Sequence, residues 1–237
     1  LSVAFSKSAV LHLGGRFNLM FAYAFENFSI TPSDSVKDLG VIIDNRLDFS
    51  DHLSFIVAKA SKVCNLIFLA FSCRDPLFLI RLFNVYVRPI LEYNCCVWSP
   101  YKISDISFIE SVQRRFTKRI PLISAWSYKR RLEFLGQDPL ELRRLRCDII
   151  QVYKILNKLD VVNFDFLSKA ETRTRGHSKM FSLPPAKTSL RDRFFTHRVV
   201  RVWNSLPGSL VSAGSLNCFK SRLFGVDLSG QLRLRLD

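Results

Sequence analysis

Residues 86–120, YVRPILEYNCCVWSPYKISDISFIESVQRRFTKRI, contain the pattern that decides the fold of this chain. In the second half of the stretch, apolar residues recur at intervals of three or four and form one stripe along a helix: Ile106, Ile109, Val112, Phe116 and Ile120. On the same helix, Arg114 and Lys118 lie opposite the stripe, and Arg115 and Arg119 lie on its flanks. The spacing predicts a helix with one face packed into a core and another face that presents cations to a polyanion.

The composition is that of a folded and strongly basic protein. Its 237 residues suit one large or two small domains, and 48% of them are hydrophobic, which argues against disorder. The chain has 35 Lys and Arg against 20 Asp and Glu, so its net charge is +15. A charge of this sign favours nucleic acid or an anionic membrane as the partner. The alternative is a soluble basic protein without a polyanionic partner.

More than half of the excess charge is concentrated in residues 111–159. This span holds twelve basic residues: Arg114, Arg115, Lys118, Arg119, Lys129, Arg130, Arg131, Arg143, Arg144, Arg146, Lys154 and Lys158. It holds four acids: Glu133, Asp138, Glu141 and Asp148. Successive helices with this excess predict several phosphate contacts, which position a duplex without reading its sequence.

The patterns that would indicate a membrane protein or an exported protein are weak. The longest strongly apolar run without charge, residues 63–73, is shorter than the about 20 residues that a membrane-spanning helix needs. The chain begins at Leu1 without the basic region and cleavage site of a signal peptide, and the missing initiator Met suggests a fragment. Six scattered cysteines include no C-x-x-C pair, so we expect reduced, mostly buried thiols in an intracellular protein.

The N-terminal 49 residues favour short strands. Residues 19–25 and 28–30 are β-prone, with Glu26-Asn27 as a turn between them, and Gly14-Gly15 is another turn. The strongest strand signal covers residues 36–43. The pattern predicts a small antiparallel sheet, which buries little surface alone and needs a neighbour.

From residue 50 onward the chain reads as helical. Ser50 or Asp51 is placed to cap the first helix, and Asp75-Pro76 starts another that Pro89 should kink or end. Gly136 is a candidate helix-terminating glycine, and Asp138-Pro139 with Glu141 resembles a capping box. Residues 195–206 form a further helical stripe, and Ser215 is placed to cap the last helix.

No catalytic constellation stands out in the sequence. The acidic cluster Asp44, Asp48 and Asp51 lacks the glycine and closing glutamate of a calcium loop, so we interpret these residues as turn and cap residues. His177, in a basic polar loop, either touches phosphate or is solvated. Four aromatic residues either stack on bases or belong to the core: Trp98, Tyr101, Trp126 and Tyr128.

Several segments, in order, resemble non-LTR (LINE-type, jockey-like) retrotransposon reverse transcriptases downstream of the catalytic palm. The segments are SAVLHLGG (8–15), VKDLGVIIDNRLDFSDHL (36–53), KASK (59–62), LFNVYVRPILEYNCCVWSPY (82–101), DISFIESVQRRFTKRI (105–120), TRGHSKM (174–180), FFTHRVVRVWNSLP (194–207) and SLNCFKSRL (215–223). Together they cover nearly the whole chain.

The resemblance implies a thumb and downstream helices that hold an RNA template and a growing DNA strand. Lys37, Asp38, Leu39 and Gly40 would then lie where these enzymes have the primer-grip strand. The family's catalytic Tyr-x-Asp-Asp motif and its fingers would precede Leu1. The resemblance therefore implies no catalytic residue, metal ion or cofactor in this chain, with magnesium expected only in the missing palm.

We therefore predict a mainly α protein with a small antiparallel β part at its N-terminus. Residues 1–49 would be the end of the palm, 50–100 a helical thumb, 101–160 the basic helices and 161–237 a C-terminal helical segment. The expected partners are an RNA–DNA hybrid and the missing palm and fingers, without a membrane, in the nucleus or cytoplasm. The predicted nucleic-acid-binding residues are Lys37, Gly40, Arg114, Arg115, Lys118, Arg119, Lys129, Arg130 and Arg131. The alternatives are a non-enzymatic helical protein-interaction module and a decayed relic of a mobile element.

Overall fold

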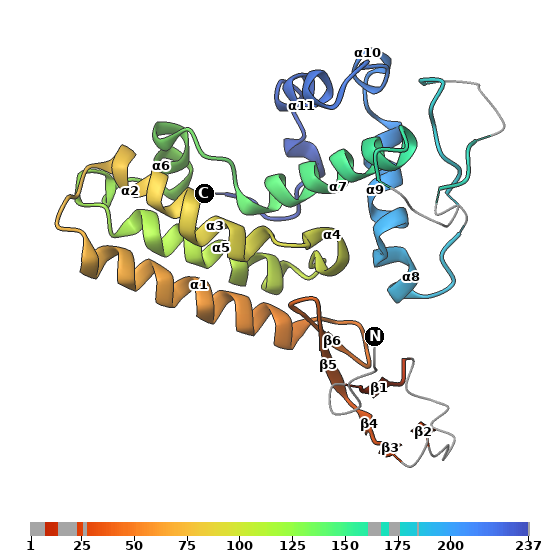
Figure 1. Ribbon diagram of the computed structural model, residues 1–237. Coiled ribbons are helices and arrows are strands. Elements are labelled where there is room, and N and C mark those ends of the chain that lie inside the picture. The colour runs from red at the N-terminus through yellow and green to blue at the C-terminus, as the bar shows by residue number, and fades with distance from the viewer. Residues whose placement is uncertain are drawn as a thin grey trace.

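The computed structural model describes residues 8–13, 23–25, 28–160, 167–170, 176–183 and 185–236 (Figure 1). The chain is mainly helical with a few short strands near its N-terminus, which confirms the predicted fold class. The strands are β1 (Val10–Leu11), β2 (Tyr23–Phe25), β3 (Phe28–Ile30), β4 (Pro32–Ser33), β5 (Ser35–Asp38) and β6 (Val41–Asp44). Gly14-Gly15 and Glu26-Asn27 lie outside the described residues.

The described strands form two-stranded pairs rather than one sheet. β2 pairs with β3 and β5 with β6 in antiparallel orientation, as expected, but β1 pairs with β4 in parallel. The prediction of a single strand over residues 36–43 was wrong. Leu39 and Gly40 have φ angles of 44° and 89° and form a two-residue turn, which folds this segment into the β5–β6 hairpin.

Helices occupy most of the chain from residue 50 onward. The α-helices are α1 (Ser50–Ala70), α2 (Pro76–Leu82), α3 (Arg88–Glu92), α4 (Cys95–Trp98), α5 (Ile103–Lys118), α6 (Tyr128–Leu135), α7 (Leu140–Leu156), α8 (Ser189–Arg193), α9 (Phe195–Asn204), α10 (Gly208–Val211) and α11 (Leu216–Phe224). The other helical turns are the π-helical η2 (Phe83–Val87) and the 3₁₀ turns η3 (Pro121–Ile123) and η4 (Ser229–Gln231). The π turn ends two residues before Pro89, where a kink was predicted.

The structure confirms the helix boundaries predicted at Asp75, Gly136 and Ser215, each of which is set by local backbone or side-chain interactions. The Asp75 carboxylate accepts the backbone N–H of Phe78 at 2.7 Å, and Gly136 ends α6 at a φ of 59°. Ser215 caps α11. The prediction for α1 was wrong, because Phe49 occupies the cap position in the left-handed conformation.

Two residues of the acidic cluster, Asp44 and Asp48, stabilise the turn before α1 through backbone hydrogen bonds, as predicted. The Asp44 carboxylate accepts the backbone N–H groups of Arg46, Asp48 and Phe49. The Asp48 carboxylate accepts the N–H of Ser50 at 2.9 Å, and this bond lowers the pKa of Asp48.

Two hydrophobic cores meet along α7. The first lies among α1, α2, η2, α3, α4 and α5 and includes Leu140 at the start of α7. The second lies among α7, α9, α10 and α11 and includes Ile149, Val152 and Tyr153. Figure 1 shows α7 running from the first bundle to the C-terminal helices. The four-segment division of the chain stays a prediction.

Among the described helices, α1 alone is long and apolar enough to cross a membrane. This is weak evidence, because the core helices of soluble proteins have the same length and composition. Leu53, Ile56, Val57 and Ala60 of α1 are buried in the first core. The packing is compatible with a soluble protein.

Candidate nucleic-acid interface

Helix α5 has the two faces that its sequence predicts. All five residues of the apolar stripe, Ile106 to Ile120, are buried in the structure. Arg114, Arg115, Lys118 and Arg119 are exposed. Hydrophobic burial of one side therefore fixes the orientation of the cations on the other.

Helix α6 adds two of its three predicted cations to this surface. Lys129 and Arg130 are exposed, but Arg131 is only 2% exposed, so its assignment to the surface was wrong. Tyr128 and Arg131 are three residues apart and share the inward side of this short helix, with the guanidinium carbon 5.5 Å from the ring centroid. We call the remaining residues the basic face: Arg114, Arg115, Lys118, Arg119, Lys129 and Arg130.

No residue of the basic face forms an ion pair within the described part of the chain. Aromatic rings and neutral polar groups support its arginines instead. The guanidinium of Arg114 lies 4.9 Å from the Tyr128 ring centroid, and that of Arg130 lies 4.6 Å from Trp126. Such contacts orient a guanidinium without neutralising its charge. The positive charge of this surface therefore remains available to an anion.

Arg119 connects the basic face to α1. Its Nη1 donates to Asn65 Oδ1 at 2.7 Å, and its guanidinium carbon lies 4.0 Å from the Phe68 ring centroid. Asn65 and Phe68 belong to the C-terminal half of α1. The surface therefore spans α1, α5 and α6.

A buried carboxylate, Glu110, holds the helices beneath the basic face together. Glu110 is 1% exposed and accepts the Tyr128 hydroxyl at 2.5 Å and the backbone N–H of Leu140 at 2.9 Å. Burial raises the pKa of Glu110, although these bonds and the Arg144 charge oppose the rise. Burial and the Glu110 charge also raise the pKa of Tyr128. One side chain of α5 therefore binds α6 and caps α7.

This arrangement corrects the predicted capping box of α7. Asp138 instead pairs with Arg146. The Glu141 carboxylate accepts the backbone N–H groups of Arg233 and Leu234 from the C-terminal segment. The acceptor at the start of α7 is Glu110, thirty positions earlier in the chain than Leu140, so no local motif indicates it.

The cations of α7 do not extend the basic face, contrary to what their number in the sequence indicated. Arg143 pairs with Glu92, and Lys154 Nζ lies 3.6 Å from Asp160 Oδ2. Arg144 is only 1% exposed, and its burial lowers the pKa of its guanidinium. The charge excess of residues 111–159 is therefore divided between a surface and an interior.

Lys37 and Gly40 lie at the other end of α1. Lys37 is exposed on β5 with its Nζ 4.9 Å from the Phe55 ring centroid. Phe55 and Phe68 are separated by thirteen steps of α1, which span about 20 Å along the helix axis. The structure therefore does not bring Lys37 and Gly40 together with the basic face.

The exposed side of α1 contains two cations that the sequence analysis missed. Lys59 and Lys62 follow Phe55 at helical spacing and are exposed, and neither forms an ion pair in the described residues. Helical spacing could have identified both lysines, because they lie off the apolar stripe of α1 and therefore on its exposed side. They lie along α1 between Lys37 and the Arg119 contact.

The four aromatic residues predicted either to stack on bases or to belong to the core are all buried or partly buried in the structure. Trp98 and Tyr128 are buried, and Trp126 and Tyr101 are partly buried beneath Arg130 and Arg193.

The hydrogen bonds of the His177 ring differ from both interpretations of this residue, the phosphate contact and the solvated side chain. Its Nε2 lies 3.0 Å from the Trp203 carbonyl, and its Nδ1 accepts the Lys179 N–H, so the ring joins two segments of the chain.

Cysteines and acids do not form a metal centre in the described residues. The structure contains no group of three or more His, Cys, Asp or Glu side chains placed to hold a metal ion there. All six cysteines are free thiols, and burial raises the pKa of Cys64 to about 12. Cys64 and Cys95 are buried, but Cys73 is exposed, so the prediction of mostly buried thiols was only partly correct.

Comparisons with known proteins leave the function open. No protein family matches the chain, and no solved structure matches it. An uncharacterized protein of Caenorhabditis elegans is 27% identical over 123 residues, which cover 51% of this chain and 62% of that relative. The chain therefore spans less than two thirds of the length of the relative that it matches. The description of that protein names no activity or partner.

Proposed function

We propose that this chain is the post-palm part of an RNA-directed DNA polymerase of a non-LTR retrotransposon and holds an RNA–DNA hybrid through phosphate contacts. The observation that supports the proposal most directly is the basic face, whose six cations are exposed and without carboxylate partners in the described residues. The segments that resemble this family supply the identity of the polymerase.

The chemistry of the basic face suits a phosphate backbone. Guanidinium groups bind phosphate oxygens with two parallel hydrogen bonds, and lysine contributes a mobile point charge. Each contact releases condensed counterions, so binding weakens steeply as salt is added. Contacts of this kind fix the position of a duplex but carry no sequence information.

The exposed side of α1 would extend the contact. Lys59 and Lys62 lie along α1 between Lys37 and the basic face, so a duplex that follows α1 meets cations at both ends of the helix. The chain would act as a holding surface, and the catalytic carboxylates and magnesium would belong to the upstream palm. A nucleic-acid partner of this kind places the protein in the nucleus or cytoplasm.

The first test is binding to a fluorescently labelled RNA–DNA hybrid across a salt titration. With about four phosphates held at the basic face, log Kd should change with log salt concentration with a slope of about 3 to 4. The Arg114→Glu/Lys118→Glu variant should bind at least about tenfold more weakly at low salt and show a smaller slope, because two phosphate contacts become repulsive.

The matched control is Lys169→Glu/Arg222→Glu, which reverses the same amount of charge at exposed positions of the C-terminal part. This variant should retain most of the affinity. Equal losses in both variants would mean that net charge, rather than the basic face, attracts the hybrid. No binding of the wild-type chain at low salt would refute the proposal.

One observation favours the alternative of a protein-interaction module. Several large apolar side chains are exposed on the hairpin, on η2 and directly after α3: Leu39, Val85, Tyr86 and Tyr93. Leu39 is 81% exposed, and the Tyr93 hydroxyl donates to the Leu39 carbonyl at 3.1 Å. Gel filtration would favour this function if the chain forms a stable complex with a protein and ignores the hybrid.

A further inference from the structure

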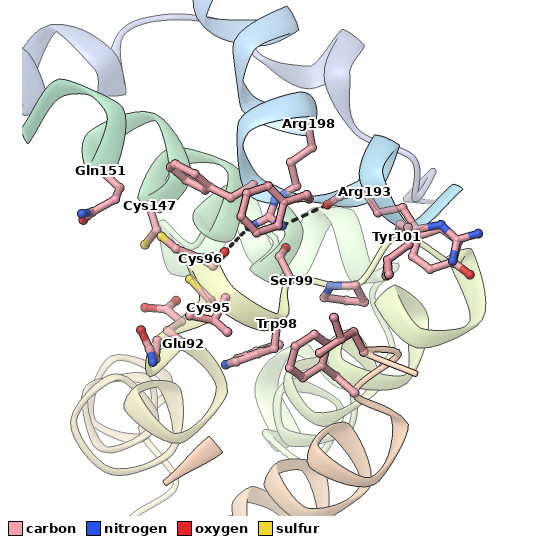
Figure 2. A pocket seen from close by; sticks show the side chains of 18 of the residues that line it. Glu92, Cys95, Cys96, Trp98, Ser99, Tyr101, Cys147, Gln151, Arg193 and Arg198 are labelled. Carbon is pink, nitrogen blue, oxygen red and sulfur yellow. Dashed lines mark hydrogen bonds between the residues drawn. The ribbon is translucent and has the colours of Figure 1, made fainter. Parts of the chain in front are cut away.

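A cavity of about 980 Å³ lies where the two cores meet, between α4, α7 and the α8–α9 segment (Figure 2). Five parts of the described chain line it: residues 43–49, 92–105, 147–155, 188–198 and Lys220. No residue of the basic face belongs to the lining. Small-molecule sites measure about 300–1,000 Å³, so this cavity is large enough for a ligand of nucleotide size.

The walls of the cavity are largely apolar and include several flat side chains. The apolar lining residues include Ile43, Phe49, Val97, Ile150, Phe194 and Phe195. Tyr101 and Trp98 add further aromatic surface, and Figure 2 shows Tyr101 on the opposite side of the cavity from Cys96 and Cys147. Walls of this kind favour a planar ring system, which gains from desolvation and from stacking.

Two arginines give the cavity an anion-binding edge. The guanidinium carbon of Arg193 lies 3.3 Å from the Tyr101 ring centroid, and that of Arg191 lies 5.5 Å from the Phe194 ring centroid. Neither arginine has a carboxylate within 4.0 Å in the described part of the chain. Stacking leaves the N–H donors at the edge of a guanidinium available, so both can bind an anion.

The other charged groups of the lining are mostly satisfied within the protein. Arg198 donates to both Asp148 oxygens and to the Cys96 carbonyl, as Figure 2 shows in part, and Lys154 pairs with Asp160. Among the acids, Glu92 pairs with Arg143, and Asp48 accepts a backbone N–H. Among the described residues the lining contains five basic and three acidic side chains: Lys154, Arg191, Arg193, Arg198 and Lys220 against Asp48, Glu92 and Asp105. The net charge of the cavity is positive.

We propose that this cavity binds an aromatic anion of the nucleotide class. The base would lie against the apolar walls, and the phosphate would be held by Arg191 and Arg193. The ligand has two possible sources, a free nucleotide or the unpaired end of a nucleic-acid strand, and both present the same base and phosphate. This site is separate from the basic face and does not depend on hybrid binding there.

The test is a fluorescence titration of the full chain with methylanthraniloyl-AMP. Arg191→Gln/Arg193→Gln should weaken binding at least about tenfold, because the phosphate loses both guanidinium partners. The matched control, Lys169→Gln/Arg222→Gln, removes two exposed cations outside the lining and should bind like the wild type.

A second variant fills the cavity and leaves its charges in place. Val97 is partly exposed on α4 and lines the cavity, so Val97→Trp should exclude the base with little cost to folding. We expect it to bind methylanthraniloyl-AMP at least about tenfold more weakly, with an unchanged circular dichroism spectrum and unchanged hybrid binding at low salt. Retained nucleotide binding in both cavity variants would overturn the proposal.

A labelled single-stranded RNA hexamer distinguishes the two sources. It is measured in the Arg114→Glu/Lys118→Glu background, so that the basic face contributes little. Tighter binding of the hexamer than of the mononucleotide, lost in Val97→Trp, identifies a strand end as the ligand, whereas binding of the mononucleotide alone identifies a free nucleotide. Saturable binding of oleate without binding of either nucleotide probe would overturn the proposal in favour of an aliphatic ligand, and so would no binding of any probe.

Discussion

The cations of α5 and α6 and those of α7 and α9 have similar frequencies in the sequence but opposite roles in the structure. On α5, at Arg119 directly after it and on α6, six of them are exposed and lack carboxylate partners in the described residues. On α7 and α9, Arg143, Arg146 and Arg198 are each paired with a carboxylate. A local charge count therefore does not define a surface. The position of the carboxylates decides whether an arginine attracts a partner or joins two helices.

The largest effect expected from this comparison is the loss of a buried pair. The Arg198 Nε lies 2.8 Å from Asp148 Oδ2, and the Asp148 side chain is almost fully buried. Asp148→Ala would leave a mostly buried guanidinium without its carboxylate, so we expect a loss of about 3 kcal/mol in the free energy of unfolding. Urea denaturation measures this loss.

The control for this change is Asp192→Ala, which breaks the exposed pair between Arg201 and Asp192. Both side chains of that pair are largely solvated, so its removal should cost less than about 1 kcal/mol. Similar losses in the two variants would show that burial does not distinguish the pairs.

A smaller effect is expected from the titration of Glu110. Burial raises the pKa of this carboxyl in the folded protein above its ordinary value of 4.5. Between these two pKa values the folded state binds the proton more than the unfolded state does, so stability falls as pH rises. The contribution of Glu110 is greatest below pH 4.5 and is lost as the pH rises through the folded pKa.

The measurement is the difference in unfolding free energy between the wild type and Glu110→Gln, taken from urea denaturation at a series of pH values. We expect this difference to decrease as the pH rises from below 4.5, because glutamine does not titrate. A difference that increases with pH would contradict the raised pKa of Glu110.

The smallest effect on stability is expected on the basic face itself. Arg114→Ala/Lys118→Ala should change the unfolding free energy by no more than about 1 kcal/mol, because both residues are exposed and form no ion pair in the described chain, and the contact of Arg114 with the Tyr128 ring is lost. The same variant should weaken hybrid binding. A loss of several kcal/mol would mean that these residues serve the fold rather than a partner.

Local signals predicted much of the fold because the interactions that they describe are local. The stripe on α5 and the caps at Asp75 and Ser215 involve residues that are neighbours on one helix. Gly136 ends α6 for the same kind of reason, through its own backbone conformation. Patterns of this kind are complete within a few residues of sequence.

The candidate site was predicted less well because its details depend on distant contacts. The helical spacing of Arg131 from Tyr128 places Arg131 on the inward side of α6 and Arg130 on the outward side, but the packing of this short helix against its neighbours is what buries the arginine. Lys37 contacts α1 near its start and Arg119 contacts α1 near its end, and the sequence alone does not indicate this separation. The cavity combines segments as distant as residues 43 and 220.

The sharing of α7 between two cores has a consequence for how the chain unfolds. Leu140 at the start of α7 is packed in the first core, and Val152 and Tyr153 near its end are packed in the second core. Neither core can therefore open without exposing part of a helix that also stabilises the other core. The described helices should therefore lose their structure in a single cooperative transition. A protease cut after residue 160 would leave the apolar side of α7 without its cover and yield an aggregating piece rather than two stable domains.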